Sequence, residues 1–159
     1  MSQERRAPNR SLVTTTKLGV TIRRPVEDVF AVLSDVEKVP IWSRNTIEEK
    51  LLTPGPLGVG SRRRAVLKGF AGRAMVNEAE MVEFEPNRKM VVRVIDAPVP
   101  GRIVIDFLPV AEGTRLDWTA ELTPRGLLRP AGPLIGAFYR WAFQKDLDNL
   151  KALMESGRL

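Results

Sequence analysis

Apolar and polar residues alternate with a period of two over most of this chain. Between residues 11 and 24, β-branched and apolar residues alternate with polar ones, which predicts a strand with one face in water. The same period returns after residue 46, between turns rich in glycine and proline. It predicts six further strands, at residues 47–52, 61–68, 73–85, 89–96, 102–110 and 114–122. Short connections make these strands antiparallel neighbours, and broken alternation within residues 73–85 indicates a bulge.

Helical periodicity follows the first strand and returns at the end of the chain. Pro25 ends the first strand and starts a short helix with an apolar stripe that reaches Leu33. Ser34 and Asp35 can both cap a second short helix, which Pro40 closes. A long helix is then predicted over residues 133–156.

The two halves of this long helix differ. Its second half has one apolar stripe, formed by Phe143, Leu147, Leu150 and Met154. Its first half, residues 134–142, carries Arg140 as its only charge, which predicts burial on all sides. An antiparallel sheet with one wet face must bury the other face. We therefore expect an α+β fold in which a seven-stranded antiparallel sheet curls around the long C-terminal helix, with two short helices after the first strand.

Seven segments of the chain share the order and spacing of a known family. They are residues 22–30 (IRRPVEDVF), 33–35 (LSD), 39–42 (VPIW), 58–61 (GVGS), 85–88 (EPNR), 113–118 (GTRLDW) and 150–155 (LKALME). The chain resembles the SRPBCC superfamily of START and pollen-allergen-like helix-grip proteins, in its polyketide cyclase/dehydratase-like branch. The resemblance implies one domain over residues 11–159, after a flexible tail of residues 1–10. It also implies a hydrophobic cavity between the sheet and the long helix.

The composition excludes several kinds of chemistry. Cysteine and histidine are both absent, which rules out disulfides and Ser-His or Cys-His nucleophiles. No metal-ligand spacing or phosphate-binding fingerprint occurs, so neither a metal nor a cofactor is expected. The net charge of +6 permits attraction to anionic surfaces, but no specific nucleic-acid motif accompanies it. Without a signal peptide or an apolar run long enough to span a membrane, the expected location is the cytoplasm.

Candidate ligand-binding residues are apolar and come from the long helix, the inward strand positions and the loop after the second short helix. They are Phe30, Trp42, Met75, Met81, Leu116, Trp118, Leu134, Phe138, Trp141 and Ala142. The same residues would also fill a dry core, and Trp42 would also serve as a lid over the end of that core. Phe138 is expected to face inward, with Tyr139 about 100° around the helix from it.

Five residues are candidates for catalysis: Tyr139, Arg93, Glu78, Glu80 and Asp106. Tyr139 is the only tyrosine and hence the only phenolic donor. The charged residues interrupt strands, where inward-facing groups would polarise an enol or a ketone. On a solvated face they would instead form cross-strand ion pairs.

Three functions fit these features. The first is binding of one hydrophobic small molecule, such as a lipid, an isoprenoid or a polyketide-like compound. The second is a cyclase or dehydratase-type enzyme that works without histidine, cysteine or metal. The third is a protein-interaction or chaperone-like regulatory module, through an apolar patch of Leu127, Leu128, Leu134 and Ile135. A monomer and a homodimer are both compatible with the sequence.

Overall fold

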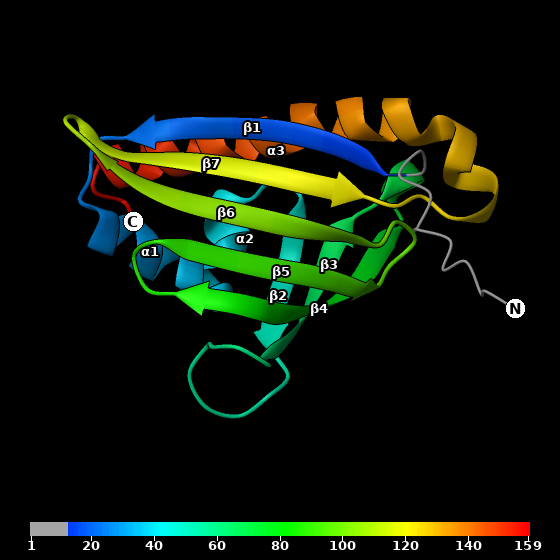
Figure 1. Cartoon of the computed structure of the whole chain (residues 1–159), viewed down its shortest axis with the longest axis horizontal. Helices are drawn as coiled ribbons and strands as arrows, with labels where there is room; N and C mark the ends of the chain where they lie inside the picture. The colour runs from blue at the N-terminus through cyan, green and yellow to red at the C-terminus, as the bar shows by residue number, and fades with distance from the viewer. Residues whose placement is uncertain (1–12) are drawn as a thin grey trace, which may run out of the picture.

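The computed structural model describes residues 13–159, in which a seven-stranded antiparallel sheet curls along a long helix (Figure 1). The strands lie in the order β1-β7-β6-β5-β4-β3-β2, so β1 and β2 form the two edges. Their bounds are β1 Thr14–Ile22, β2 Thr46–Leu51, β3 Arg62–Lys68, β4 Ala74–Glu85, β5 Lys89–Asp96, β6 Gly101–Val110 and β7 Gly113–Leu122. The predicted tail at residues 1–10 lies outside the described residues.

The helices are two short ones after β1, three short 3-10 segments and a long helix at the C-terminus. Their bounds are α1 Val26–Ser34, η2 Val36–Lys38, α2 Val39–Trp42, η3 Phe70–Gly72, η4 Gly126–Ala131 and α3 Gly132–Glu155. The predicted helix-grip architecture is confirmed. The prediction that Pro40 closes the second short helix is wrong, because this proline lies in the first turn of α2. There its missing N–H has no intrahelical partner to lose.

Two bulged strands determine which side chains face the inside of the sheet. In β4, the pairing with β5 shifts at two points, which confirms the bulge predicted in residues 73–85. In β2, Ile47 is the extra residue in the pairing with β3. The shift leaves Ile47 exposed and turns both Thr46 and Glu49 inward.

The packed core lies between the sheet, the short helices and the second half of α3. Phe30 of α1 packs against Phe84 and Phe107, with ring centroids 5.4 and 5.0 Å away. The long helix contributes the buried side chains Leu147, Leu150 and Met154. The predicted apolar stripe on the second half of this helix is therefore confirmed as core.

Helix α3 also covers the free edge of β1. The Gln144 side chain accepts a hydrogen bond from the Gly19 N–H at 3.3 Å and donates one to the Gly19 carbonyl at 3.0 Å. Farther along the strand, Lys151 Nζ donates to the Thr21 carbonyl at 2.6 Å. These contacts satisfy backbone groups that an edge strand otherwise presents to other chains.

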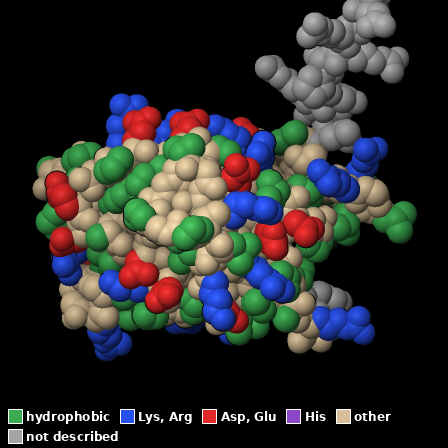
Figure 2. Space-filling view, turned by 90° about the horizontal axis from the view of Figure 1, so that it is seen from below, with side chains coloured by type: hydrophobic (Ala, Val, Ile, Leu, Met, Phe, Trp, Pro, Cys, Tyr) green, Lys and Arg blue, Asp and Glu red, His purple; other side chains and the backbone are tan. Residues whose placement is uncertain are grey.

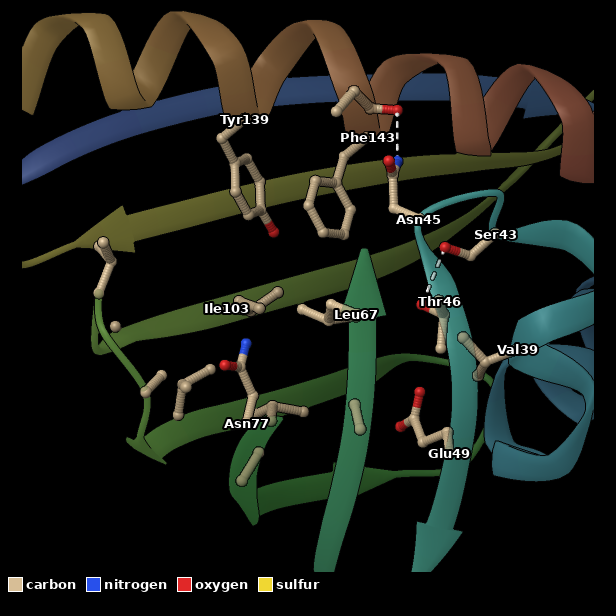
Figure 3. A pocket seen from close by; sticks show the side chains of 18 of the residues that line it. Val39, Ser43, Asn45, Thr46, Glu49, Leu67, Asn77, Ile103, Tyr139 and Phe143 are labelled. Atoms are coloured by element: carbon tan, nitrogen blue, oxygen red, sulfur yellow. Dashed lines mark hydrogen bonds between the residues drawn. The ribbon is translucent and has the colours of Figure 1, made fainter. Parts of the chain in front are cut away.

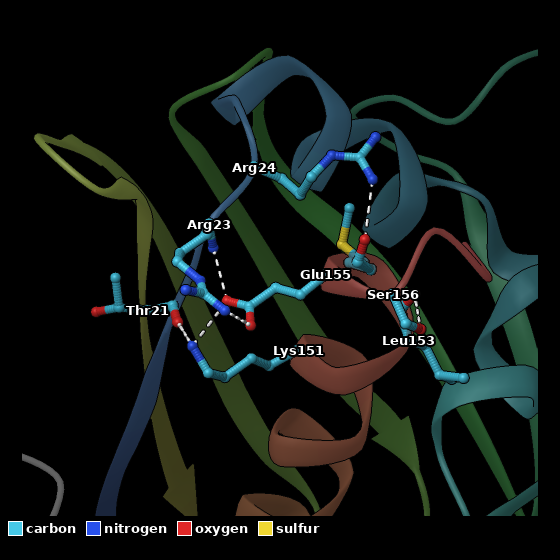
Figure 4. A network of polar contacts seen from close by, with 8 residues as sticks. Thr21, Arg23, Arg24, Lys151, Leu153, Glu155 and Ser156 are labelled. Carbon is cyan, nitrogen blue, oxygen red and sulfur yellow. Dashed lines mark hydrogen bonds and ion pairs between the residues drawn. The ribbon is translucent and has the colours of Figure 1, made fainter.

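The last turn of α3 is tied to the segment that follows β1 (Figure 4). The Glu155 carboxylate accepts hydrogen bonds from Lys151 Nζ at 2.8 Å and from the Arg23 backbone N–H at 2.9 Å. These two hydrogen bonds lower the pKa of Glu155 to about 2. Arg24 Nη1 donates to the Met154 carbonyl at 2.9 Å, where the end of a helix leaves carbonyls without intrahelical partners.

The first half of α3 lacks the burial on all sides that its composition predicts. Leu134, Phe138 and Trp141 are 74%, 65% and 58% exposed. On the opposite side the helix lies very close to β1, since a Cβ on Gly136 would be 2.6 Å from Thr14 Cγ2. The sheet supports this half of the helix from one side and does not enclose it.

Candidate functional site

A cavity of about 330 Å³ lies between the inner face of the sheet and the first half of α3 (Figure 3). Its volume is at the lower end of the range of roughly 300–1,000 Å³ found for small-molecule pockets. Most of its wall is apolar, with Leu33, Val39, Leu67, Val92 and Ile103 among the lining residues. Two further lining residues, Met75 and Phe138, are 37% and 65% exposed. The cavity therefore reaches the surface between the β3–β4 turn and α3.

A carboxylate and a guanidinium lie in the cavity wall. Glu49 faces inward because of the bulge in β2, and Arg63 of β3 faces inward because it alternates with the exposed Arg62 and Arg64. Glu49 Oε1 is 2.7 Å from Arg63 Nη1. Burial raises the pKa of the Glu49 carboxyl, and the opposing effect of the Arg63 charge does not cancel this rise. The carboxyl therefore keeps its proton to a higher pH than an exposed glutamate.

Three buried side-chain atoms within residues 13–159 have no hydrogen-bond partner, and all three belong to cavity-lining residues. They are Trp42 Nε1, Glu49 Oε1 and Asn77 Oδ1. The contact of Glu49 Oε1 with Arg63 is an ion pair that lacks the alignment of an N–H···O hydrogen bond. In Figure 3, Glu49 and Asn77 point into the cavity from either side of β3. Trp42 Nε1 and Asn77 Oδ1 thus have no polar partner, and Glu49 Oε1 has only the ion pair with Arg63, in residues that line a mostly apolar cavity.

Tyr139 supplies a further polar group to the cavity. Its ring stacks on Phe143 with centroids 4.1 Å apart, and its hydroxyl oxygen accepts a hydrogen bond from Trp118 Nε1 at 3.1 Å. Burial raises the pKa of Tyr139 well above its ordinary value, so the phenol stays protonated. Because the oxygen accepts from Trp118, the phenol hydrogen remains available to donate to another group.

A buried carboxylate holds the chain between α2 and β2 against α3. Asp146 accepts hydrogen bonds from Ser43 Oγ at 2.7 Å, the Arg44 N–H at 2.9 Å and Asn45 Nδ2 at 3.0 Å. Ser43 and Asn45 both line the cavity. The Asp146 network therefore positions one wall of the cavity relative to the helix that forms another.

Comparisons with known proteins agree with this architecture. A family model described as polyketide cyclase / dehydrase and lipid transport matches residues 12–155. The chain belongs to this family. No curated protein sequence matches the chain.

Solved structures of similar fold come from several sources. The di-domain ARO/CYC StfQ from the steffimycin biosynthetic pathway superposes with a TM-score of 0.79 at 17% identity, over 94% of this chain and 53% of that one. The protein TTHA0849 from Thermus thermophilus gives a TM-score of 0.78 at 16% identity, over 92% of this chain and 100% of that one. DR_A0006 from Deinococcus radiodurans gives a TM-score of 0.67 at 21% identity, over 91% of this chain and 98% of that one. At these identities the likeness establishes the fold alone.

In this member of the family, the cavity brings together six of the ten predicted ligand-binding residues. They are Trp42, Met75, Met81, Trp118, Phe138 and Ala142. Phe30 and Leu116 lie instead in the packed core, and Leu134 and Trp141 are exposed on the outer side of α3. Phe138 reaches only the mouth of the cavity, whereas Tyr139, which we expected to lie away from the inward face, lines its wall.

The four charged candidates for catalysis lie on the outer face of the sheet. Glu78 pairs with Arg62 at 3.1 Å, and Glu80 pairs with Arg93 at 2.8 Å. Asp106 is also on that face, since its neighbours along β6 on either side, Ile105 and Phe107, are buried. Of the five candidates, only Tyr139 lines the cavity.

Sequence reasoning missed Glu49, Arg63 and Asn77. Charged and amide side chains on a strand suggest that they lie on its solvent-exposed face, so the sequence alone gives no reason to place these residues in a site. Alternation along the strands would have identified two of them. Arg63 and Leu67 lie on the same face of β3, and Asn77 lies on the same face of β4 as Met81. Alternation alone does not establish the position of Glu49, since it is in phase with Ile47, which is exposed, and out of phase with Thr46, which is buried.

Residues 13–159 contain no group of three or more acidic, histidine or cysteine side chains arranged to hold a metal ion. In the same part of the chain, no helix combines the length and the apolar character needed to cross a bilayer.

Proposed function

We propose that this protein binds one amphiphilic small molecule, with a largely apolar body and at least two hydroxyl or carbonyl groups. The observation that carries the proposal is that the three buried polar atoms without a hydrogen-bond partner within residues 13–159 all belong to residues that line one largely apolar cavity. An unpaired buried polar group costs roughly 1–3 kcal/mol, and a ligand that satisfies it recovers that free energy on binding. A lipid, an isoprenoid alcohol and a polyketide-like compound all have the required character.

The cavity presents donors and acceptors to such a molecule. Trp42 Nε1–H and the Tyr139 hydroxyl donate to carbonyl or hydroxyl oxygens. Asn77 Oδ1 and Glu49 Oε1 accept from ligand hydroxyls. The apolar side chains between these groups contribute burial, at about 25 cal/mol per Å² of apolar surface removed from water.

Native mass spectrometry after incubation with a lipid and metabolite extract tests the proposal. The protein is expected to retain a compound, and Trp42→Phe is expected to weaken retention about tenfold, because one hydrogen bond of roughly 1.5 kcal/mol is lost. Trp141→Phe is the matched control, since this exposed tryptophan lies outside the cavity. Retention of no compound, or equal retention by both variants, would contradict the proposal.

A second candidate function is a dehydration or cyclisation of the bound molecule, favoured by the raised pKa of the Glu49 carboxyl. The carboxyl would protonate a hydroxyl that leaves as water, and the resulting carboxylate would take a proton from the adjacent carbon. The chain shares its fold with the ARO/CYC protein StfQ, which supports this reading at the level of fold only. Loss of water from the retained compound over time, abolished in Glu49→Gln without loss of binding, is the expected result. A retained compound whose mass and chromatographic retention time both stay constant would rule this candidate out.

A further inference from the structure

Helix α3 has a second apolar face that packing within residues 13–159 does not bury. Its core face is formed by the side chains that include Leu147 and Leu150, whereas Leu134, Phe138 and Trp141 recur at i, i+4 and i+7 on the solvent side. Just before the helix, Leu127 of η4 is 98% exposed. We call Leu127, Leu134, Phe138 and Trp141 the outer stripe. Single exposed apolar residues are ordinary on protein surfaces, but a stripe of large ones at helical spacing indicates an interaction surface.

The outer stripe is accompanied by positive charge alone. Residues 122–145 contain four cationic residues, Arg125, Arg129, Arg140 and Lys145, and no aspartate or glutamate. Lys145 Nζ lies 3.9 Å above the ring centroid of Trp141, so charge and apolar surface are in direct contact. An amphipathic helix that combines aromatic and leucine side chains with lysine and arginine is typical of one that lies on an anionic membrane surface.

A second basic segment lies beside this helix. The β3–β4 region, residues 62–77, contains five cationic residues and no acidic one. Arg62 pairs with Glu78 and Arg63 with Glu49, whereas Arg64, Lys68 and Arg73 form no ion pair within residues 13–159. The Lys68 N–H donates to the Asn45 carbonyl at 2.8 Å, and Asn45 Nδ2 donates to the Ala142 carbonyl of α3 at 3.4 Å. Figure 2 shows Lys and Arg side chains next to hydrophobic ones at its right-hand end, which is the end where α3 begins in Figure 1.

The mouth of the cavity lies within this surface. Phe138 belongs both to the outer stripe and to the cavity wall, and Met75 of β4 lines the cavity from the other side of its opening. A molecule that leaves the cavity between these two residues emerges between α3 and the β3–β4 turn.

We propose that the outer stripe and its surrounding cations dock this protein on a membrane surface that contains anionic lipids, with α3 parallel to the membrane plane. Leu127, Leu134 and Trp141 are exposed and lie outside the cavity lining, so the stripe suits a fluid acyl-chain layer, which needs no complementary shape. The positive charge of Arg125, Arg129, Arg140 and Lys145, with no acidic residue between them in the sequence, matches phosphate headgroups. The proposal does not require the cavity to be occupied, so its failure and the failure of the ligand-binding proposal are distinguishable.

Vesicle binding with tryptophan fluorescence tests the docking. Trp42 and Trp118 are buried, so a change in emission on vesicle addition reports mainly on Trp141. With phosphatidylcholine vesicles that contain phosphatidylglycerol, we expect co-sedimentation and a shift of emission to shorter wavelength. Both should decline without phosphatidylglycerol, and also at about 1 M salt, where the screening length falls to roughly 3 Å.

Two double variants separate the contributions of charge and apolar contact. Arg129→Gln with Arg140→Gln should weaken vesicle binding about 25-fold, since each cation near an anionic surface contributes a factor of roughly five. Leu127→Ser with Leu134→Ser should weaken it by about tenfold or more through lost apolar contact. Arg88→Gln and Leu108→Ser are the matched controls, because both residues are exposed and lie outside the surface described above.

Three results would overturn the proposal. The first is the absence of vesicle binding by the wild-type protein. The second is binding that the controls weaken as much as the double variants do. The third is a stable dimer, detected by analytical ultracentrifugation, that Leu127→Ser with Leu134→Ser dissociates, because the stripe would then be an interface between two copies of the chain.

Discussion

Trp42 Nε1 and Asn77 Oδ1 give up hydrogen bonds to water on folding and gain none from the rest of the described protein, and Glu49 Oε1 gains only the ion pair with Arg63. The two atoms without any partner therefore lower the stability of the folded state. Natural proteins retain such local costs mainly at functional sites. These residues can be tested one at a time. If the polar atom has a structural role, removing it should lower the free energy of unfolding; if it serves ligand binding, removing it should raise the free energy of unfolding.

Asn77→Leu is expected to stabilise the protein and to weaken ligand retention. Removing an unpaired buried amide oxygen should raise the free energy of unfolding by about 1 kcal/mol. Urea denaturation measures this change, and native mass spectrometry measures retention. Asn45→Leu is the matched control and should lower the free energy of unfolding, because Asn45 donates to Asp146 and to the Ala142 carbonyl. A destabilised Asn77→Leu protein would show that Asn77 has a structural partner.

Glu49→Gln is expected to change the pH dependence of stability. The pKa of the Glu49 carboxyl is higher in the folded protein than in the unfolded chain. Its contribution to the free energy of unfolding is therefore fully present below the pKa of the unfolded state, and it is lost as the pH rises through the pKa of the folded state. The wild type should therefore lose stability above pH 4.5, the ordinary value for the carboxyl, relative to a variant that does not titrate. Urea denaturation at a series of pH values should give a difference near zero in acid that grows toward neutral pH. A difference independent of pH would mean that the Glu49 pKa is not raised.

At the scale of elements, α3 performs three tasks with different parts of its surface. Its second half buries one face in the core, Gln144 and Lys151 satisfy the backbone of the β1 edge, and Tyr139 lines the cavity. Gly136 makes this arrangement possible, because any side chain there would clash with Thr14 of β1. A helix held so closely at the sheet edge leaves its opposite face free.

Asp146→Ala is expected to separate the α2–β2 connection from α3. Three hydrogen bonds to a buried carboxylate are lost, and their donors lose their partner, so the free energy of unfolding should fall by about 3 kcal/mol. Urea denaturation measures the loss. Asp148→Ala is the matched control two residues away, an exposed position where the change should stay within about 0.5 kcal/mol. Equal effects of the two substitutions would show that the network does not hold these elements together.

At the scale of the whole molecule, a ligand that binds only the folded state raises the melting temperature. At a free concentration of a retained ligand about 100 times its Kd, the gain is roughly 2.7 kcal/mol, which corresponds to a rise of about 8 °C for a domain of this size. Differential scanning calorimetry with the compound identified by mass spectrometry measures the shift. Ala79→Trp, which fills the cavity from β4, should abolish the shift. A full shift in that variant would place the ligand elsewhere.

The architecture could be predicted from local patterns because each pattern has a local physical cause. The period of two in residues 114–122 and the helical stripe from Phe143 to Met154 specify which face of each element is apolar. Short turns then require antiparallel pairing of neighbouring strands, since parallel pairs need a long crossover connection. A smaller part of the cavity wall follows from the same reasoning, since Trp118 and Ala142 occupy inward positions of their elements.

The sequence by itself determined the order of the elements, the helix-grip architecture and the residues of the main core, because hydrophobic periodicity acts within each element. Only the tertiary structure decided which residues meet in the cavity. The bulge in β2 turned Glu49 inward, the register of β3 brought Arg63 beside it, and the contact of Gly136 with β1 set the rotation of α3. That rotation placed Tyr139 in the cavity and Trp141 in solvent. Burial of a polar group and exposure of an apolar one depend on contacts between distant segments, which no local pattern encodes.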